Sequence, residues 1–192
     1  MLELTKVIVR LSIYFLILFT AHNAFGTIVT RVHEEEGDEK LGPFLFSLNY
    51  TTFMIMNLFA PLLTYSLKWQ IALSSIAYTF NFATNIFMIG QSEAVKYSLS
   101  AIGAVVNGIS ASFLWVSLGR YIHNACHHFN DIENKGYYYG MFNTIYCSSN
   151  IFSGIVITFG LELLSHRNYF ILVTGIGVFS FLYSVLMIKN IK

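Results

Sequence analysis

The chain has 192 residues, of which 55% are hydrophobic and only 11% are charged. A soluble globular domain carries about 25% charged residues, so this composition excludes an ordinary soluble fold. The net charge of +1 and the lack of a basic patch give no indication of a nucleic-acid partner.

Six long apolar stretches follow one another, and most charged residues lie in the short segments between them. A run of about 20 apolar residues, at 1.5 Å per residue in a helix, crosses the ~30 Å hydrocarbon core of a bilayer. The sequence therefore predicts an all-α membrane protein, with one six-helix transmembrane domain over residues 1–192. The predicted spans are residues 7–30, 43–66, 70–90, 96–119, 137–164 and 169–188.

With six spans, both termini lie on the same side of the membrane. Seven Lys and Arg residues fall on that side and four on the other, so the positive-inside rule predicts that both termini are inside. The inside is the cytosol, or the matrix if the protein lies in the mitochondrial inner membrane. The sequence leaves the plasma membrane and organellar membranes open.

The first and third spans carry polar residues. His22 is the only His, Asp or Glu well inside a span, and Asn23 follows it. We interpret His22 as a hydrogen-bonded structural histidine, with a proton site as the alternative. In the third span Tyr78, Asn81 and Asn85 follow at spacings of three and four, so they share one helix face. No buried carboxylate pair is present in the spans, which disfavours proton coupling.

Small and amide residues recur along the fourth and fifth spans. In the fourth, Gly103 and Asn107 lie on one stripe, and Gly108 and Ser112 lie on another with small-xxx-small spacing, which lets helix backbones approach closely. An Asn that faced lipid would lack partners, so these stripes should face other helices or a cavity. Helix packing is the first interpretation and a solute pathway the alternative. The residues expected in either role are His22, Asn23, Asn81, Asn85, Asn107, Asn143 and Asn150.

A cluster of His123, His127 and His128, with Cys126 and Asp131 nearby, follows the fourth span. A zinc site needs four suitable ligands in the right geometry, and this pattern does not require one. We interpret the cluster as a solvated loop at the membrane interface. The sequence contains no nucleophile motif, phosphate-binding loop or paired carboxylates, so we predict no catalytic residues, cofactor or metal, and no enzyme activity.

Four segments resemble the UNC-ninety-three-like family, a branch of the major facilitator superfamily described as ion-channel regulators. They are residues 15–37, 57–63, 101–122 and 136–154. The most specific pattern is in the fourth span, and further matches occur in the first, second and fifth. The residues that carry the resemblance are Asn23, Ala60, Pro61, Gly103, Ala104, Trp115, Gly119, Tyr121, Gly140, Phe142, Ser149 and Gly154.

The resemblance covers the amino-terminal, six-helix half of a family member. It implies half of a major-facilitator fold, built as a 3+3 inverted repeat. Two departures are visible. The family often has a Gln two residues before the Tyr of the Trp-to-Tyr segment, and the nearby residues here are Leu118 and Arg120. The turn at Lys68 lacks the Gly-Asp-Arg pattern of facilitator transporters. The resemblance and the small-residue stripes together predict close helix packing at Gly103, Gly108, Ser112, Trp115, Gly119, Gly140 and Gly154.

Two functions remain open from the sequence. The first is an accessory, structural or regulatory subunit of a larger membrane assembly, either a channel or an organellar (including respiratory) complex, in contact with lipid and other integral membrane proteins. The second is a solute transporter made by homodimerisation of two six-helix halves. A truncated product of a full transporter gene is a third possibility. The spacing of residues names neither a partner nor a solute.

Overall fold

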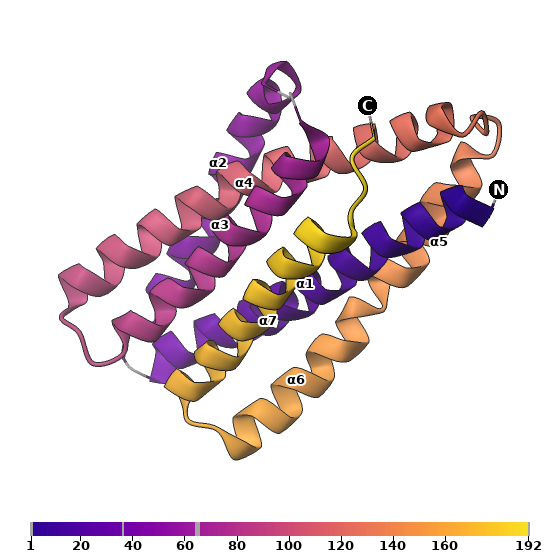
Figure 1. The fold of residues 1–192 in the computed structure, drawn as a ribbon. Helices are drawn as coiled ribbons and strands as arrows, with labels where there is room; N and C mark the ends of the chain where they lie inside the picture. The colour runs from indigo at the N-terminus through magenta and orange to yellow at the C-terminus, as the bar shows by residue number, and fades with distance from the viewer. Residues whose placement is uncertain (1, 36, 64–65, 192) are drawn as a thin grey trace.

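The computed structural model describes residues 2–35, 37–63 and 66–191 of the chain. Its helices run in sequence, and Figure 1 shows them as long rods that lie side by side. They are α1 (Leu2–Glu35), α2 (Leu41–Phe59), the short 3-10 turn η1 (Ala60–Leu62), α3 (Leu67–Met88), α4 (Glu93–His128), α5 (Lys135–Cys147), α6 (Ser149–Leu163) and α7 (His166–Met187).

The described residues form six segments long and apolar enough to cross a membrane, with α2 continued by η1 and α5 continued by α6. No strand occurs among the described elements. The predicted all-α fold with six membrane-spanning helices is therefore confirmed. The chain is an integral membrane protein by the length and apolar character of these segments.

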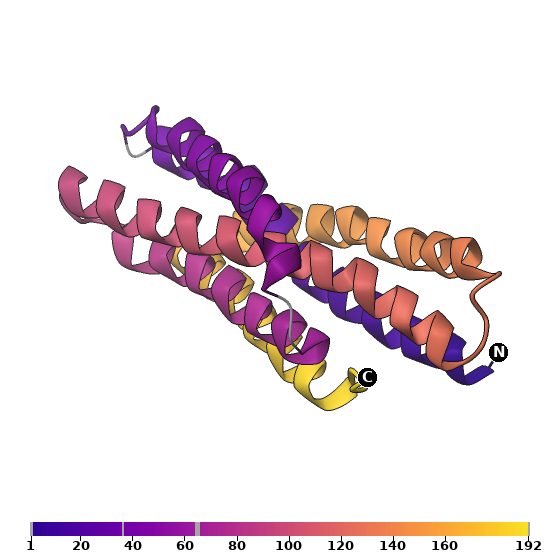
Figure 2. The same cartoon turned by 90° about the horizontal axis from the view of Figure 1, so that it is seen from above.

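The helices pack in two groups that meet through α3 and α7. In one group α4 packs against α2 and α3, and in the other α1 packs against α5, α6 and α7. In Figure 2 α4 runs from the end of the molecule that holds α2 and α3 to the end that holds α5 and the N-terminus. The main apolar core follows α1, where Tyr14, Phe15 and Leu18 are fully buried. In the most apolar stretch of each span, 61% of residues are buried in α1 but only 11% in α2 and 17% in α5–α6. The α2 span and the α5–α6 span therefore form the outer faces.

Local chemistry explains where several helices end. Gly37, just after α1, and Gly90, just after α3, have φ angles of 85° and 81°, which glycine adopts without a steric penalty. Asn130 ends α4 in the same way, with a φ of 54°. Pro61 lacks a backbone N–H, and α2 changes into a 3-10 turn at Ala60, one residue before it.

Two helical segments differ from the spans predicted for them. The fourth span was expected to end at residue 119, whereas α4 continues to His128. Hydropathy detects the length that crosses the membrane, and a helix can continue beyond it. On these extra turns Tyr121, Ile122 and Ala125 are buried, so packing rather than lipid stabilises them. The histidine cluster is therefore helical up to His128, and Cys126 is buried in α4 instead of lying in a loop.

The fifth span was expected to be one helix and is instead divided at Ser148 into α5 and α6. The hydroxyl of Thr144 donates to the carbonyl of Gly140 at 2.9 Å, and that of Ser148 donates to the carbonyl of Thr144 at 3.1 Å. Similar side-chain bonds occur inside unbroken α1 and α3, whereas the backbone itself tightens at Ser148: its N–H donates to the Ile145 carbonyl at 3.2 Å, and its carbonyl accepts from the Ile151 N–H at 3.0 Å. The break lies near the middle of the span, beside the cavity described below.

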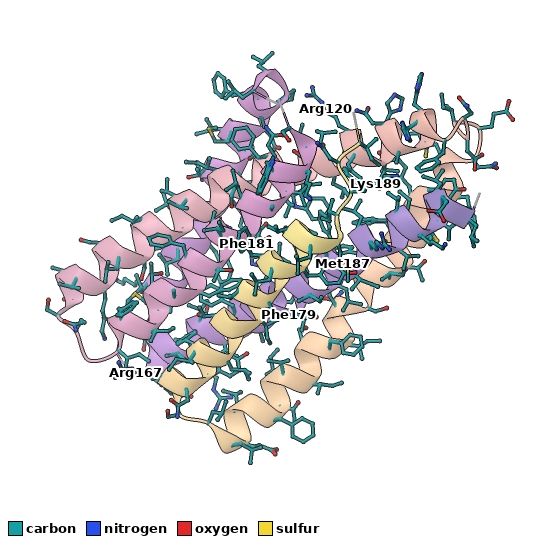
Figure 3. The ribbon with its side chains drawn as sticks, in the orientation of Figure 1. Arg120, Arg167, Phe179, Phe181, Met187 and Lys189 are labelled. Atoms are coloured by element: carbon teal, nitrogen blue, oxygen red, sulfur yellow. The ribbon has the colours of Figure 1, made fainter. Side chains whose placement is uncertain are left out.

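Charged side chains lie toward the two ends of the bundle. Figure 3 shows Arg120 and Lys189 toward one end and Arg167 at the other, with Phe179 on α7 between them. Phe179 is 57% exposed, as expected for a side chain in contact with lipid acyl chains. At the end that holds Arg167, Glu35 of α1 pairs with Arg31 at 2.8 Å and with His166 of α7 at 3.2 Å.

Candidate functional site

A cavity of about 270 Å³ lies between α1, α2, α3, α4 and α5, close to the middle of each span. We call it the central cavity. Its polar lining comes from His22, Asn23, Asn49 and Asn107. Its aromatic lining comes from Phe19, Tyr50, Phe53, Tyr78, Trp115 and Tyr146. Of the described residues that line it, none is Asp, Glu, Lys or Arg.

Two buried polar atoms at this cavity have no hydrogen-bond partner among the described residues: Asn107 Oδ1 and His22 Nδ1. The Asn107 amide group donates from Nδ2 to Asn49 Oδ1 at 3.1 Å. The Asn107 residue is only 1% exposed. An unpaired buried carbonyl oxygen costs about 1–3 kcal/mol, so its position beside a cavity calls for an explanation.

The aromatic side of the cavity is a cluster of rings in mutual contact. Ring centroids are 5.4 Å apart for Phe19 and Trp115, 5.0 Å for Phe19 and Tyr146, and 5.7 Å for Trp115 and Tyr146. The last two pairs are edge-to-face, the geometry that aromatic quadrupoles favour. The His22 ring lies edge-to-face against Tyr78 with centroids 5.0 Å apart. These contacts hold the walls in fixed orientations.

Close approach of α2 and α4 brings Asn49 and Asn107 together. A Cβ atom at Gly108 would lie 2.5 Å from the backbone oxygen of Asn49, a distance that only glycine allows. One turn further along α4, the Ser112 hydroxyl donates to the Phe53 carbonyl at 2.8 Å. The small residues of α4 therefore set the helix spacing that forms one wall of the cavity.

A second amide pair lies at the exposed edge of the cavity. Asn23 Nδ2 of α1 donates to Asn150 Oδ1 of α6 at 2.9 Å, and is 3.4 Å from Ser149 Oγ. Both acceptors directly follow the break at Ser148. The division of the fifth span thus gives α6 an amide that can reach α1, which ties the two helices together inside the membrane.

Comparison with known proteins identifies the family. The family described as ion channel regulatory protein UNC-93 matches residues 35–191, most of the chain. The chain belongs to the UNC-93 family. No curated protein and no solved structure matches it.

In this UNC-93 family chain, most of the predicted stripe on the fifth span points away from the rest of the described structure; the exception is Asn150, which accepts a hydrogen bond from Asn23 of α1. Asn143, Cys147 and Asn150 are exposed, and so are the glycines of the stripe. A Cβ added at Gly140 or Gly154 would meet nothing within 4 Å. The close packing expected at these two glycines is thus absent from the described part of the chain, and any packing there must involve another molecule.

The remaining predicted residues lie apart from the central cavity or at its edge. Asn81 lines a narrow extension of about 20 Å³ that shares His22, Asn49 and Asn107 with the central cavity. Asn85 is buried deeper in α3, where its amide donates to the Asn81 carbonyl at 2.9 Å. A Cβ at Gly103 would lie 2.8 Å from Asn81 Oδ1, whereas at Gly119 the nearest atom, the Tyr139 hydroxyl, is 3.7 Å away.

The histidines that follow Arg120 show no metal geometry. Among the described residues, no group of three or more His, Cys, Asp or Glu side chains could hold a metal ion. His123 Nδ1 instead lies 3.2 Å from Lys135 Nζ. In the α4–α5 connection, Asp131 accepts hydrogen bonds from the Tyr138 hydroxyl at 2.7 Å and from the Asn134 amide at 2.6 Å.

This connection predicts a pH-dependent contribution to stability. The hydrogen bonds from Tyr138 and Asn134 hold the pKa of the Asp131 carboxyl below its usual value. A lowered pKa stabilises the folded state above the unfolded pKa of about 3.9, and that stabilisation is lost as the pH falls through the folded pKa. The purified wild-type chain should therefore have a higher melting temperature than Asp131→Asn at neutral pH. The difference between the two melting temperatures should shrink below about pH 4. A difference that stays constant across this range would contradict the assignment.

Several cavity residues escaped the sequence analysis. Asn49 was not identified there, although an amide within an apolar span was a usable signal. Phe19 and Tyr146 gave no signal, because aromatic residues are frequent throughout this chain. Trp115 was expected to serve close helix packing; it contacts the rings of Phe15 and Phe19 on α1 and also lies on the cavity wall.

Proposed function

We propose that this chain is a non-enzymatic regulatory subunit that packs in the membrane against another integral membrane protein, such as a channel, through α5 and α6. Its membership of an ion channel regulatory family supports a regulatory role. The short connections between the helices leave little surface outside the bilayer, so contact with a partner would occur mainly between helices.

The observation that carries this proposal is the exposed polar stripe on α5 and α6. Asn143 is exposed within an apolar span, and its side chain makes no hydrogen bond to another described residue. In a bilayer an amide that faced lipid would lack partners, so it should face another protein or water. Gly140 lies one turn before it with open space above its Cα, which allows a second helix to approach closely.

We further propose that the fold is a transporter-like half built from two inverted units, residues 1–94 and the remainder. Each major helix contact becomes another major contact when the helices of the two units are exchanged: α1 with α4, α2 with α5–α6, and α3 with α7. The α1 contact with α5–α6 becomes the α4 contact with α2, the α1–α7 contact becomes α4–α3, and α3–α7 maps onto itself. This pairing is the one that a 3+3 inverted repeat requires.

Site-specific photo-crosslinking tests the subunit proposal. A crosslinker placed at residue 143 should react with another membrane protein in native membranes, whereas one at Val178, exposed on α7, should react with lipid. Gly140→Leu should abolish the protein crosslink by filling the stripe. It should not lower the melting temperature of the purified chain, because no described atom lies near that glycine.

The pattern of crosslinks would also distinguish the alternatives. Equal protein crosslinks from residues 143 and 178, or none from either, would overturn the proposed docking face. Crosslinks from residue 143 to a second copy of this chain would favour the second candidate function, a homodimeric solute transporter. The central cavity with its amide lining is the observation that supports that candidate, and native mass measurement of one copy per assembly would exclude it.

A further inference from the structure

The central cavity holds buried polar atoms that the fold leaves unused. Asn107 is 1% exposed, and its Nδ2 donates one of its two N–H groups to Asn49, while the acceptor Oδ1 has no described partner. His22 Nδ1 is likewise unpaired and buried. In a neutral imidazole with its proton on Nε2, Nδ1 is a second acceptor. Asn107 Oδ1 can only accept, so a ligand that pairs with both atoms in this tautomer must be a hydrogen-bond donor.

The walls of the cavity indicate the charge of that donor. The rings of Phe19, Tyr78, Trp115 and Tyr146 line it, and aromatic faces carry the negative end of a quadrupole. A cation within about 6 Å of such a ring is attracted to its face, most strongly when water is excluded. The described lining residues include no Asp, Glu, Lys or Arg, so the ring faces are the feature that favours a cation over an anion.

We propose that the central cavity binds a small organic cation, a protonated amine, whose N–H groups donate to Asn107 Oδ1 and His22 Nδ1 while the aromatic rings surround its alkyl part. The cavity volume of about 270 Å³ limits the size of the ligand. Drug-sized ligands occupy pockets of roughly 300–1,000 Å³, so the amine has only a few heavy atoms.

This inference is independent of the proposed docking face. The site is formed by side chains of this chain alone, and Asn107 and Tyr78 on its floor are buried. Binding can therefore be measured on the full chain, purified in detergent, without any partner. Failure of the amine to bind would leave the docking proposal intact, and absence of a partner would leave the amine site intact.

Intrinsic fluorescence offers a direct test, because the chain has only two tryptophans. Trp69 is 47% exposed on α3, and Trp115 lines the cavity. In Trp69→Phe the remaining emission reports on the site. Titration with n-propylammonium should change this emission saturably. The neutral n-propanol and the anion propionate, which match it in size, should bind at least tenfold more weakly at equal ionic strength.

A pair of matched variants tests the role of the unpaired oxygen. In the Trp69→Phe background, Asn107→Asp places a carboxylate at the acceptor position, and charge-assisted hydrogen bonds are about twice as strong as neutral ones. It should tighten propylammonium binding about tenfold. Asn85→Asp is the control, because Asn85 Oδ1 is also buried and unpaired but does not line the cavity. It should leave the affinity unchanged.

The titrations decide whether the central cavity is an amine site. Saturable binding of propylammonium, with the tenfold gain in Asn107→Asp alone, supports the site. Equal binding of propanol would show that the cavity does not require a positive charge. Preferential binding of propionate would show that it selects an anion. If none of the three compounds changes Trp115 emission, or if Asn85→Asp and Asn107→Asp change the affinity equally, the cavity is not an amine site.

Discussion

Gly108→Ala should destabilise the purified chain by about 2 kcal/mol, although alanine is the better helix former. The added Cβ would lie 2.5 Å from the Asn49 oxygen and 2.9 Å from the Thr52 Cβ atom, and 3.1 Å from the Phe53 backbone nitrogen. Backbone atoms cannot rotate away as a flexible side chain can, so α2 and α4 must separate. Overpacking of this kind typically costs about 1–3 kcal/mol.

Gly140→Ala is the matched control for that substitution. It also lies within a membrane-spanning helix, but its new Cβ would meet nothing within 4 Å. The gain in helix propensity, up to about 1 kcal/mol, should then appear without a steric cost. Thermal unfolding in detergent should therefore shift in opposite directions for the two variants. Equal shifts would contradict the close approach of α2 and α4.

Helix separation has a second measurable consequence. Asn49 and Asn107 face each other at 3.1 Å only because the two backbones are in contact at Gly108. Gly108→Ala should therefore weaken the binding of propylammonium as well as lower the melting temperature. A variant that lost stability but kept full affinity would show that the cavity wall does not depend on this contact.

Lys96→Met should destabilise the chain by about 3 kcal/mol, because it removes one partner of a largely buried ion pair. Lys96 Nζ of α4 lies 2.7 Å from Asp38 Oδ2 in the α1–α2 connection, and the two side chains are only 10% and 11% exposed. The substitution leaves the Asp38 carboxylate in a site with little access to water. The pair thus fixes the α1–α2 connection against the first turns of α4.

An exposed pair of similar length provides the comparison. Lys6 and Glu3 are 2.8 Å apart, with side-chain exposures of 52% and 66%. Lys6→Met should change the unfolding free energy by less than about 1 kcal/mol, since water screens exposed charges. The double variant Lys96→Met with Asp38→Asn should recover part of the lost stability. Equal effects of the two lysine substitutions would contradict the buried state of the Lys96 pair.

Sequence reasoning succeeded where the local sequence alone decides the structure. The apolar runs predicted six spans, because the thickness of the bilayer sets the length of a crossing helix independently of its neighbours. It did not anticipate features that depend on the folded backbone. The length of α4 beyond residue 119 depends on packing of Tyr121 and Ala125. The break at Ser148 depends on backbone hydrogen bonds that tighten there.

The candidate site shows the same division. The amides of Asn23 and Asn107 were identified from the sequence, because an uncompensated amide in lipid is costly and so must have a partner or a cavity. Their separate surroundings were not predictable. Asn23 pairs with Asn150 across two helices, whereas Asn107 keeps one oxygen unpaired beside the aromatic cluster.

The sequence by itself determined that this chain lies in a membrane, how many times it crosses, and which polar residues need a hydrogen-bond partner or a cavity there. Those properties follow from transfer of each residue out of water, which local composition decides. Only the tertiary structure decided which glycines bring helices together. Gly108 and Gly140 both lie on small-residue stripes of apolar spans, yet one contacts the backbone of α2 and the other faces outward. The difference depends on helix rotation, which is set by packing among all six spans.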